Sequence, residues 1–323
     1  MKILVTPLDW GLGHATRLVP VIKWLIENHH DVIIAGSGNS LEVLKRNFPN
    51  IKTLTLQSFS PWYNARLGVA SSILLQIPKF LFCYYREFLT TKRIVKRHGI
   101  DTIISDNRYG VYSKKSKSYI ITHQLTPKCG IKILEPLEPL LARLLARWVN
   151  KFDECFIPDI SPYPNGLSGE LSNPQYIKIP YRYIGVLSRL RPAVGKTSDT
   201  DTIEWLGIIS GQEPHRTIFE KEVIKLFKTK NGRCVIVCGK IGNEHPSKDG
   251  QIEIYPYLGI EELSFFMQNA RNIVCRSGYS TIMDLYRMKK RAYLSATPQQ
   301  AEQEYLAGLL NKKYGFEELN LHL

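Results

Sequence analysis

The sequence has few of the features that mark disulfide frameworks, zinc sites or membrane spans. Its six cysteines form no Cys-x-x-Cys pair and no other metal-ligand spacing, so we expect reduced thiols and a cytosolic protein. The N-terminal residues run directly into an apolar strand and lack the regions of a signal peptide. The stretch nearest to a membrane span, Val69 to Tyr85, is interrupted by Pro78 and Lys79, so no transmembrane helix is expected.

Acidic residues are also in short supply. The chain has 43 Lys and Arg but only 29 Asp and Glu, which gives a net charge of +14. This excess favours an anionic partner, such as a nucleic acid, an acidic lipid or a phosphorylated ligand, without choosing among them. A nucleic-acid binder is the less favoured class, because the sequence has no RNA-recognition aromatic motif, zinc finger or helix-turn-helix signature.

What the sequence does contain is a repeated alternation of short apolar strands and amphipathic helices. The main strands are expected at 2–7, 31–35, 51–56, 101–105, 118–122, 154–157, 183–187, 205–209, 234–238, 253–257, 272–276 and 292–295. Among the helices, one at 137–152 is expected to turn Leu140, Leu141, Leu144, Leu145 and Trp148 to one face, one begins near Ser280, where Ser280 and Thr281 cap it or contact an anion, and one begins at Thr297-Pro298. This alternation predicts an α/β fold of parallel strands with helical crossovers. The 323 residues suit two domains, which we place at 1–190 and 203–323 with a polar linker at 191–202.

Polar residues follow the strands of the first half at the edge where α/β sheets bind ligands. Gly13 and His14 follow the first strand, Asp106 and Arg108 a later one, and His123 the next. At a helix N-terminus the dipole disfavours the protonated form of His14, so it can serve as a general base, with Asp106 orienting it. The alternatives are a capping or phosphate-contacting histidine and a loop-capping aspartate.

The stretch from Asn272 to Leu285 reads as a buried strand, a turn at Ser277-Gly278 and a helix that begins near Ser280. Free backbone N–H groups at such a helix start, with the helix dipole behind them, bind phosphate. Asp284 falls about one turn into the helix, where its carboxylate can accept hydrogen bonds from a ribose. The alternative is an ordinary strand–loop–helix connection.

Residues 69–97 combine bulky apolar side chains with basic ones. A segment of this kind suits the interface of an anionic membrane, where its cations meet lipid headgroups. The alternative is a long core helix with a solvated basic end. The first reading predicts that the protein is peripheral on the inner face of a membrane.

The motifs of the second half resemble those of the GT-B glycosyltransferases of family 28, the group that includes the peptidoglycan N-acetylglucosaminyltransferases. The resemblance rests on Cys275-Arg276-Ser277-Gly278 with Thr281 and Asp284, on Thr297-Pro298 through Glu302-Gln303-Glu304-Tyr305, and on Gly11-Leu-Gly-His14. It implies two Rossmann-like domains that face each other across a cleft. Glu304 stands where a glutamine is expected, which leaves the exact sugar open, and Asp284 stands where the family commonly has a glutamate that holds the ribose.

Carried over by position, the resemblance implies a set of nucleotide-sugar contacts, with the acceptor on the first domain near Arg108 and His123. The expected contacts are Gly13, Ser210, Gly211, Arg216, Leu258, Arg276, Ser277, Gly278, Ser280, Thr281, Asp284, Gln303 and Glu304. Within this set Gln303 and Glu304 meet the sugar hydroxyls, and Leu258 lies beside the base.

The implied reaction moves a hexose, such as N-acetylglucosamine, from a UDP-sugar to a hydroxyl of a lipid-linked or membrane-associated acceptor, with inversion. Arg276 or Arg216 and the backbone N–H groups would stabilise the leaving phosphate, so we expect no metal and no cofactor. A nucleotide-sugar epimerase and a catalytically inactive scaffold of the same fold are the alternatives. The sugar, the acceptor and the oligomeric state are left open.

Overall fold

The computed structural model describes residues 1–59, 76–130, 132–192, 202–240, 242 and 245–321. The described residues form two compact units. The first comprises Met1–Leu187 with Gln299–Glu302, and the second comprises Ser188–Pro298 with Gln303–Leu323. Most of the predicted linker and the first part of the predicted membrane segment lie outside the described residues.

The first unit is built on a parallel sheet in the order β3-β2-β1-β4-β5-β6-β7. Its strands are β1 (Lys2–Thr6), β2 (Asp31–Gly36), β3 (Lys52–Thr55), β4 (Thr102–Asp106), β5 (Lys117–Ile121), β6 (Glu154–Ile157) and β7 (Tyr181–Tyr183). Its helices are α1 (Gly13–Glu27), α2 (Gly38–Asn47), α4 (Ile77–His98) and α5 (Glu138–Val149). The 3₁₀ turns η1 (Lys132–Leu137) and η2 (Gly169–Ser172) complete it.

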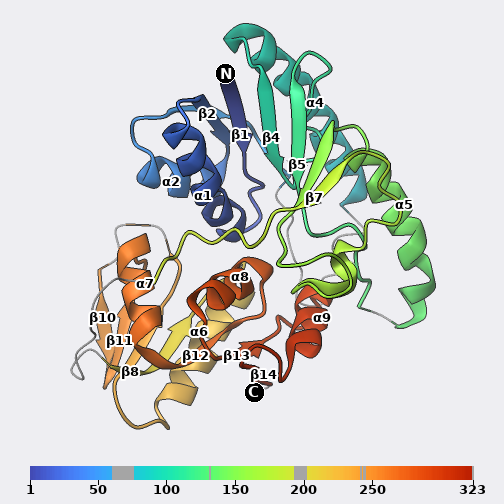
Figure 1. The fold of residues 1–323 in the computed structure, drawn as a ribbon. Coiled ribbons are helices and arrows are strands. Elements are labelled where there is room, and N and C mark those ends of the chain that lie inside the picture. Colours follow the sequence, from blue (N-terminus) through green and yellow to red (C-terminus); the bar gives the residue numbers. More distant parts are fainter. Residues whose placement is uncertain (60–75, 131, 193–201, 241, 243–244, 322–323) are drawn as a thin grey trace. The chain divides into compact units, whose positions relative to one another are not determined.

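Successive side chains along each strand point to opposite faces of this sheet, and both faces are buried. In β1, Leu4 packs with Ile94 and Val95 of α4, while its neighbours Ile3 and Val5 are buried on the opposite face. Figure 1 shows α1 and α2 together on one side of β1 and β2. Apolar runs covered on both faces are typical of parallel sheets, which is why the sequence predicted this fold class.

The second unit repeats the arrangement, in the order β10-β11-β9-β8-β12-β13-β14. Its strands are β8 (Ile203–Ile208), β9 (Cys234–Val237), β10 (Ser247–Asp249), β11 (Ile252–Tyr255), β12 (Ala270–Arg276), β13 (Ala292–Ser295) and β14 (Phe316–Glu318). Its helices are α6 (His215–Phe227), α7 (Ile260–Asn269), α8 (Tyr279–Met288) and most of α9 (Ala301–Leu310). All its pairs are parallel except β10 with β11.

Both sheets reverse their strand order beside their first strand. In the first unit the chain goes from β1 out to β3 and returns to β4 on the other side of β1. In the second unit it goes from β8 out to β11 and returns to β12 on the other side of β8. Ligands of open α/β sheets bind outside the carboxyl ends of the strands at this switch point. The loops after β1, β4, β8 and β12 are therefore the places to search.

Most elements lie within a few residues of their predicted bounds, with some differences. The helix predicted from Thr297-Pro298 begins instead at Ala301, because Gln299 takes a left-handed φ of +63° that a helix cannot include. The strand predicted at 183–187 is β7, Tyr181–Tyr183. Strands β10 and β14 were not predicted, because their Ser-Lys-Asp and Phe-Glu-Glu sequences lack an apolar alternation.

Helix α5 has an unexpected orientation. The sequence suggested a leucine face, yet the residues that pack inward are Ala142, Ala146 and Val149. Leu140 and Leu144 on the outer side are 53% and 39% exposed. Small inward residues let the helix lie close to the structure beneath it, and the large ones are left facing out. No helix in the described part of the chain is long and apolar enough to cross a membrane.

Candidate functional site

At the switch point of the first unit, His14 and Asp106 lie together. His14 stands in the first turn of α1, and its Nδ1 lies 3.1 Å from Oδ1 of Asp106 at the end of β4. The Asp106 carboxylate is fully buried, whereas the His14 side chain retains 16% exposure. A strand-end carboxylate thus holds one ring nitrogen of a histidine that solvent reaches.

A third side chain, Arg17, completes this cluster. Its Nε donates to Oδ2 of Asp106 at 2.7 Å, and its Nη2 donates to Oδ1. Burial favours a raised pKa for Asp106, but the charges of Arg17 and His14 and their hydrogen bonds outweigh burial and leave that pKa lowered. Burial lowers the pKa of His14, and the charge of Arg17 lowers it further. At neutral pH the cluster therefore holds an ionised Asp106 and a neutral His14.

The predicted acceptor residues lie close by but are largely enclosed. Arg108 is 1% exposed, and its guanidinium donates to Glu87 and to the carbonyl oxygens of Leu56 and Gln57. This corrects the expectation that Arg108 contacts an acceptor, because its donors already hold α4 and the segment after β3. His123, after β5, is also buried, and its predicted role stays untested.

At the switch point of the second unit, two loops leave backbone open to solvent. Gly211, after β8, has a φ of +111° that only glycine adopts easily, and a Cβ there would meet nothing within 4 Å. Gly278, after β12, is the N-cap of α8 and equally faces open space. The prediction that Ser280 or Thr281 caps this helix is wrong, because no side chain caps it.

Arg276 ends β12 beneath these loops. It is 3% exposed, and its Nη1 donates to the Ala296 carbonyl at 2.6 Å and to Oγ of Ser295 at 3.3 Å, neither of which carries a charge. Its Nε has no hydrogen-bond partner in the described part of the chain, and its guanidinium stacks 4.0 Å from the ring centroid of Phe219. Burial lowers the pKa of Arg276 to about 10.

The Arg276 charge also reaches the start of α6. Burial lowers the pKa of His215, and the nearby Arg276 charge lowers it further. Positive potential from Arg276 and from the N-termini of α6 and α8 therefore gathers at one switch point. An incompletely paired buried cation beside exposed amides is an arrangement that an anion would stabilise.

Two predicted phosphate contacts are occupied within the second unit. Oγ of Ser277 donates to the Gln303 carbonyl at 2.8 Å, so its side chain is already engaged with α9, and the residue is fully buried. Arg216 is bound by Glu213 and Glu220. These carboxylates neutralise its charge, and we do not retain Arg216 as a phosphate contact.

The predicted ribose and sugar contacts are distributed along the same unit. Asp284, in α8, accepts a hydrogen bond from Oγ of Ser188 at 2.5 Å, and burial raises its pKa to about 6. Gln303 is buried and accepts from the Thr297 N–H at 2.9 Å, while Glu304 is exposed. Leu258 is buried before α7. Gly13 is the first residue of α1, and Ser210 lies in the loop that follows β8.

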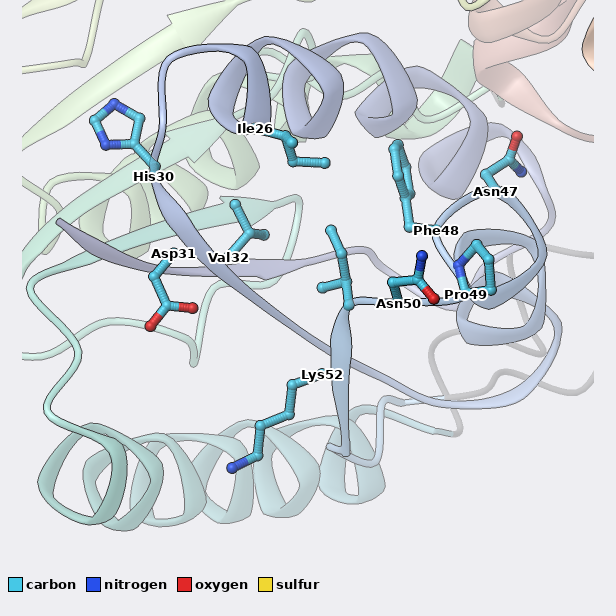
Figure 2. A pocket seen from close by; sticks show the side chains of 10 residues that line it. Ile26, His30, Asp31, Val32, Asn47, Phe48, Pro49, Asn50 and Lys52 are labelled. Atoms are coloured by element: carbon cyan, nitrogen blue, oxygen red, sulfur yellow. The ribbon is translucent and has the colours of Figure 1, made fainter.

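A separate hollow of about 540 Å³ lies at the opposite edge of the first sheet. Figure 2 shows that it is lined from the end of α1, the start of β2 and the loop that leads into β3, including His30, Asp31 and Lys52. These are amino ends of parallel strands, away from the carboxyl edge that carries His14. We therefore do not assign the hollow to the candidate site.

Metal ligands do not gather in the described ranges. No three His, Cys, Asp or Glu side chains there lie close enough to share a metal ion. The one Asp-x-Asp sequence, Asp199-Thr200-Asp201, lies outside the described residues. Transfer without a metal stays a prediction.

Comparison with known proteins gives similarity to glycosyltransferases. No family model matches the chain. A UDP-N-acetylglucosamine–N-acetylmuramyl-(pentapeptide) pyrophosphoryl-undecaprenol N-acetylglucosamine transferase of Elusimicrobium minutum is 41% identical over 69 residues, which is 21% of this chain and 19% of that relative. The match thus spans about a fifth of the relative's length.

Solved structures match over nearly the whole chain. The spinosyn rhamnosyltransferase SpnG complexed with thymidine diphosphate has a TM-score of 0.62 at 13% identity, covering 99% of this chain and 86% of that one. MurG of Acinetobacter baumannii has a TM-score of 0.54 at 12% identity, with the same coverage. The chain therefore has the two Rossmann-like domains of the GT-B fold, and the predicted fold class and resemblance are confirmed.

Proposed function

We propose that the protein is a glycosyltransferase that moves a hexose from a UDP-sugar to a hydroxyl acceptor, and N-acetylglucosamine is the sugar that we propose to test first. The proposed transfer inverts the anomeric carbon and needs no metal. The observation that carries the proposal is the second unit's switch point, where a Cβ at Gly211 or Gly278 would meet nothing within 4 Å and where β12 ends on the buried cation of Arg276. UDP-N-acetylglucosamine, the donor in the name of the Elusimicrobium minutum relative, supports this choice, whereas the similar rhamnosyltransferase SpnG is complexed with thymidine diphosphate.

The chemistry follows from charge. When the sugar leaves a nucleoside diphosphate, negative charge develops on the β-phosphate, and fixed N–H groups with a buried guanidinium stabilise it. His14, neutral and oriented by Asp106, takes the proton of the attacking hydroxyl. Attack from the face opposite the leaving phosphate inverts the anomeric carbon. Asp284 binds the ribose hydroxyls, in place of its Ser188 contact.

A thermal-shift screen against nucleotide sugars tests the proposal, because a ligand that binds only the native protein raises its Tm. We expect UDP-N-acetylglucosamine to raise Tm more than UDP-glucose, a thymidine-diphosphate sugar or a GDP-sugar. Incubating the best donor alone then separates a transferase from an epimerase, since only the epimerase converts donor without acceptor. Inversion is read from the anomeric configuration of the product, and EDTA tests metal independence. No stabilisation by any nucleotide sugar would refute the proposal.

The acceptor side is proposed to meet an anionic membrane, which would place the protein on the cytoplasmic face. The first turns of α4 expose four large apolar side chains, and the outer side of α5 exposes three more. These are Ile77, Leu81, Phe82, Tyr85, Leu140, Leu141 and Leu144. Phe80 and Tyr84 of α4 pack on Trp148 of α5, with ring centroids 5.4 and 5.8 Å apart, so the two helices present one surface.

The charges on the α4–α5 surface indicate which kind of partner covers it. The exposed cations on the same helix stretches are Lys79, Arg86, Arg143 and Arg147. Glu87, the carboxylate on α4, is buried against Arg108 and faces away from solvent. An apolar surface flanked by cations fits the interface of an acidic bilayer better than a copy of itself, whose cations would repel.

Vesicle sedimentation tests this surface. We expect binding to phosphatidylcholine vesicles that contain phosphatidylglycerol and little binding to phosphatidylcholine alone. Leu81→Glu with Leu144→Glu abolishes binding, whereas Ile218→Glu, at a similarly exposed position on α6, does not. Equal binding to both vesicle types, or dimerisation that Leu144→Glu disrupts, would contradict the assignment to acidic lipid.

A further inference from the structure

Nδ1 of His14 lies between two side chains of opposite hydrogen-bonding character. It is 3.1 Å from Oδ1 of Asp106 and 3.0 Å from Nη2 of Arg17. An ionised carboxylate only accepts hydrogen bonds, and a guanidinium only donates them. Nδ1 therefore has two possible states. If it carries a proton it donates to Asp106, and if it lacks one it accepts from Arg17.

These two states differ in what Nε2 can do. In the first, Nε2 of the neutral ring has a free lone pair and can accept a proton. In the second, Nε2 carries the proton, and His14 cannot act as a base. The tautomer of His14 therefore sets both the hydrogen bond at Nδ1 and the ability of the ring to accept a proton at Nε2.

The arrangement of Arg17 favours the first state. Its Nε and Nη2 bind Oδ2 and Oδ1 of Asp106 as a two-pronged contact, which directs the Arg17 hydrogens at the carboxylate rather than at the ring. Oδ1 keeps a further lone pair for Nδ1–H of His14. Arg17 is 2% exposed and Asp106 is fully buried, so the contact is shielded from water.

We propose that Arg17 is a positioning residue that holds Asp106 in place to receive Nδ1–H of His14, so that Nε2 is the free nitrogen, and that its charge keeps the ring neutral. The inference rests on the proposed role of His14 as the base. His14 and Arg17 are three residues apart at the start of α1, so they share one helix face.

Several charged groups act on the His14 ring. Burial, Arg17 on α1 and His123 after β5 disfavour the protonated ring, whereas Asp106 on β4 favours it, and the pKa of His14 is lowered overall. The charge of His14 in turn lowers the pKa of Glu302 on α9, so that carboxylate also interacts with the ring. A histidine paired with a lone carboxylate has its charged form stabilised. Arg17 cancels most of that effect while leaving the hydrogen bond intact, so the base stays unprotonated to a lower pH.

Nitrogen NMR of protein labelled with ¹⁵N-histidine tests the inference without substrate. His14→Gln assigns the signal among the eight histidines. We expect the wild type to show a protonated Nδ1 and an unprotonated Nε2 at neutral pH. In Arg17→Met the ring should become doubly protonated at higher pH than in the wild type, and Arg17→Lys should restore much of the difference. Lys23→Met, which removes an exposed cation from the same helix, is the matched control.

The pH–rate profile gives an independent readout. A base must be unprotonated, so raising its pKa moves the acid limb to higher pH. For Arg17→Met we expect turnover at pH 6 to fall several-fold beyond any loss at alkaline pH, because the neutral fraction of the base falls once the pH lies below its raised pKa, by about tenfold for each further pH unit. A merely structural role would lower turnover equally at all pH values.

Two outcomes overturn the inference: a protonated Nε2 in the wild type, or a ring titration that Arg17→Met leaves unchanged. If Arg17→Met does not fold, because a buried carboxylate has lost its partner, the double variant Arg17→Met with Asp106→Ala removes both charges and the acceptor of Nδ1–H. Its ring should then lose the preference for Nδ1–H, and retention of that preference would overturn the inference. Absence of transfer with every donor, alongside an Arg17-dependent titration, would refute the proposed function alone.

Discussion

The two switch points share a topology but differ in how their charges are arranged. In the first unit, the buried carboxylate of Asp106 is matched by Arg17 and His14, and all three side chains are tied to one another. In the second unit, the hydrogen bonds described for the buried cation of Arg276 go only to uncharged oxygens, and a Cβ added at the nearby N-cap Gly278 would meet nothing within 4 Å.

This difference separates two kinds of chemistry on one fold. A closed, internally neutralised cluster fixes the protonation state of a histidine, which suits proton transfer. An open cluster with excess positive potential suits an anion that arrives and leaves. Because both sheets place their switch point beside their first strand, the difference between the units lies in the side chains at their strand ends rather than in the sheets.

The largest effect, on turnover, should come from removing His14 from the cluster that it forms with Asp106 and Arg17. His14→Ala should lower turnover by about 10²- to 10⁴-fold, the usual contribution of a general base, while leaving donor affinity unchanged. Steady-state kinetics with calorimetric donor binding measures both. His29→Asn, at an exposed position with a left-handed φ that asparagine tolerates, is the control. A parallel loss of donor affinity would instead make His14 a phosphate contact.

Removing the cation of the open cluster should weaken donor binding. Arg276→Met should lower affinity for the nucleotide sugar about 10- to 100-fold, which corresponds to a lost hydrogen bond to a charged group. It should not lower Tm, because an apolar residue of similar length replaces an incompletely paired buried charge. Calorimetry and thermal unfolding check the two parts. A lower Tm with unchanged affinity would make Arg276 structural.

Adding a side chain at Gly278 should weaken donor binding without lowering the stability of the protein. Its φ of −71° suits any residue, and a Cβ meets nothing within 4 Å, so Gly278→Val should fold normally. We expect a roughly tenfold loss of donor affinity from blocked amides. Gly308→Val, at another glycine with open space, is the control in the same binding measurement. Full affinity in Gly278→Val would remove the helix start of α8 from the site.

The smallest expected effect is the pH dependence that Asp284 gives to stability and to donor binding. Burial raises the pKa of Asp284 to about 6, so the folded state resists its ionisation. The stability tied to this group is present at acid pH and is lost as pH rises through about 6. Asp284→Asn should therefore raise Tm at pH 7 but not at pH 4. If ionised Asp284 binds ribose, donor affinity should rise several-fold from pH 5 to pH 7 in the wild type and not in the variant.

Much of the fold could be predicted because it depends on local periodicity. Apolar strands alternating with amphipathic helices indicated two α/β domains, and glycine and polar residues at strand ends pointed to His14, Asp106, Gly211 and Gly278. Arg17 was missed, although its spacing of three from His14 was visible. Its importance arises from a contact with Asp106, 89 residues away, that no local pattern contains.

Other differences have the same origin. Arg108 and Ser277 are residue types common at ligand sites, but tertiary contacts turn Arg108 toward Glu87 and Ser277 toward Gln303. The inward face of α5 was misjudged because hydrophobicity alone favours burying leucine, whereas close packing here favours Ala142 and Ala146. Sequence patterns identify which edge carries the chemistry, but not which donors are already engaged.

The outward leucines of α5 have a practical consequence. Since Leu140 and Leu144 contribute little to the core, changing them to glutamine should cost little in thermal unfolding, yet it should make the purified protein less prone to self-association. Handling of the wild-type chain without detergent or lipid should be correspondingly difficult. A solubility problem in the test tube would then reflect the exposed leucines of α5 rather than a failure to fold.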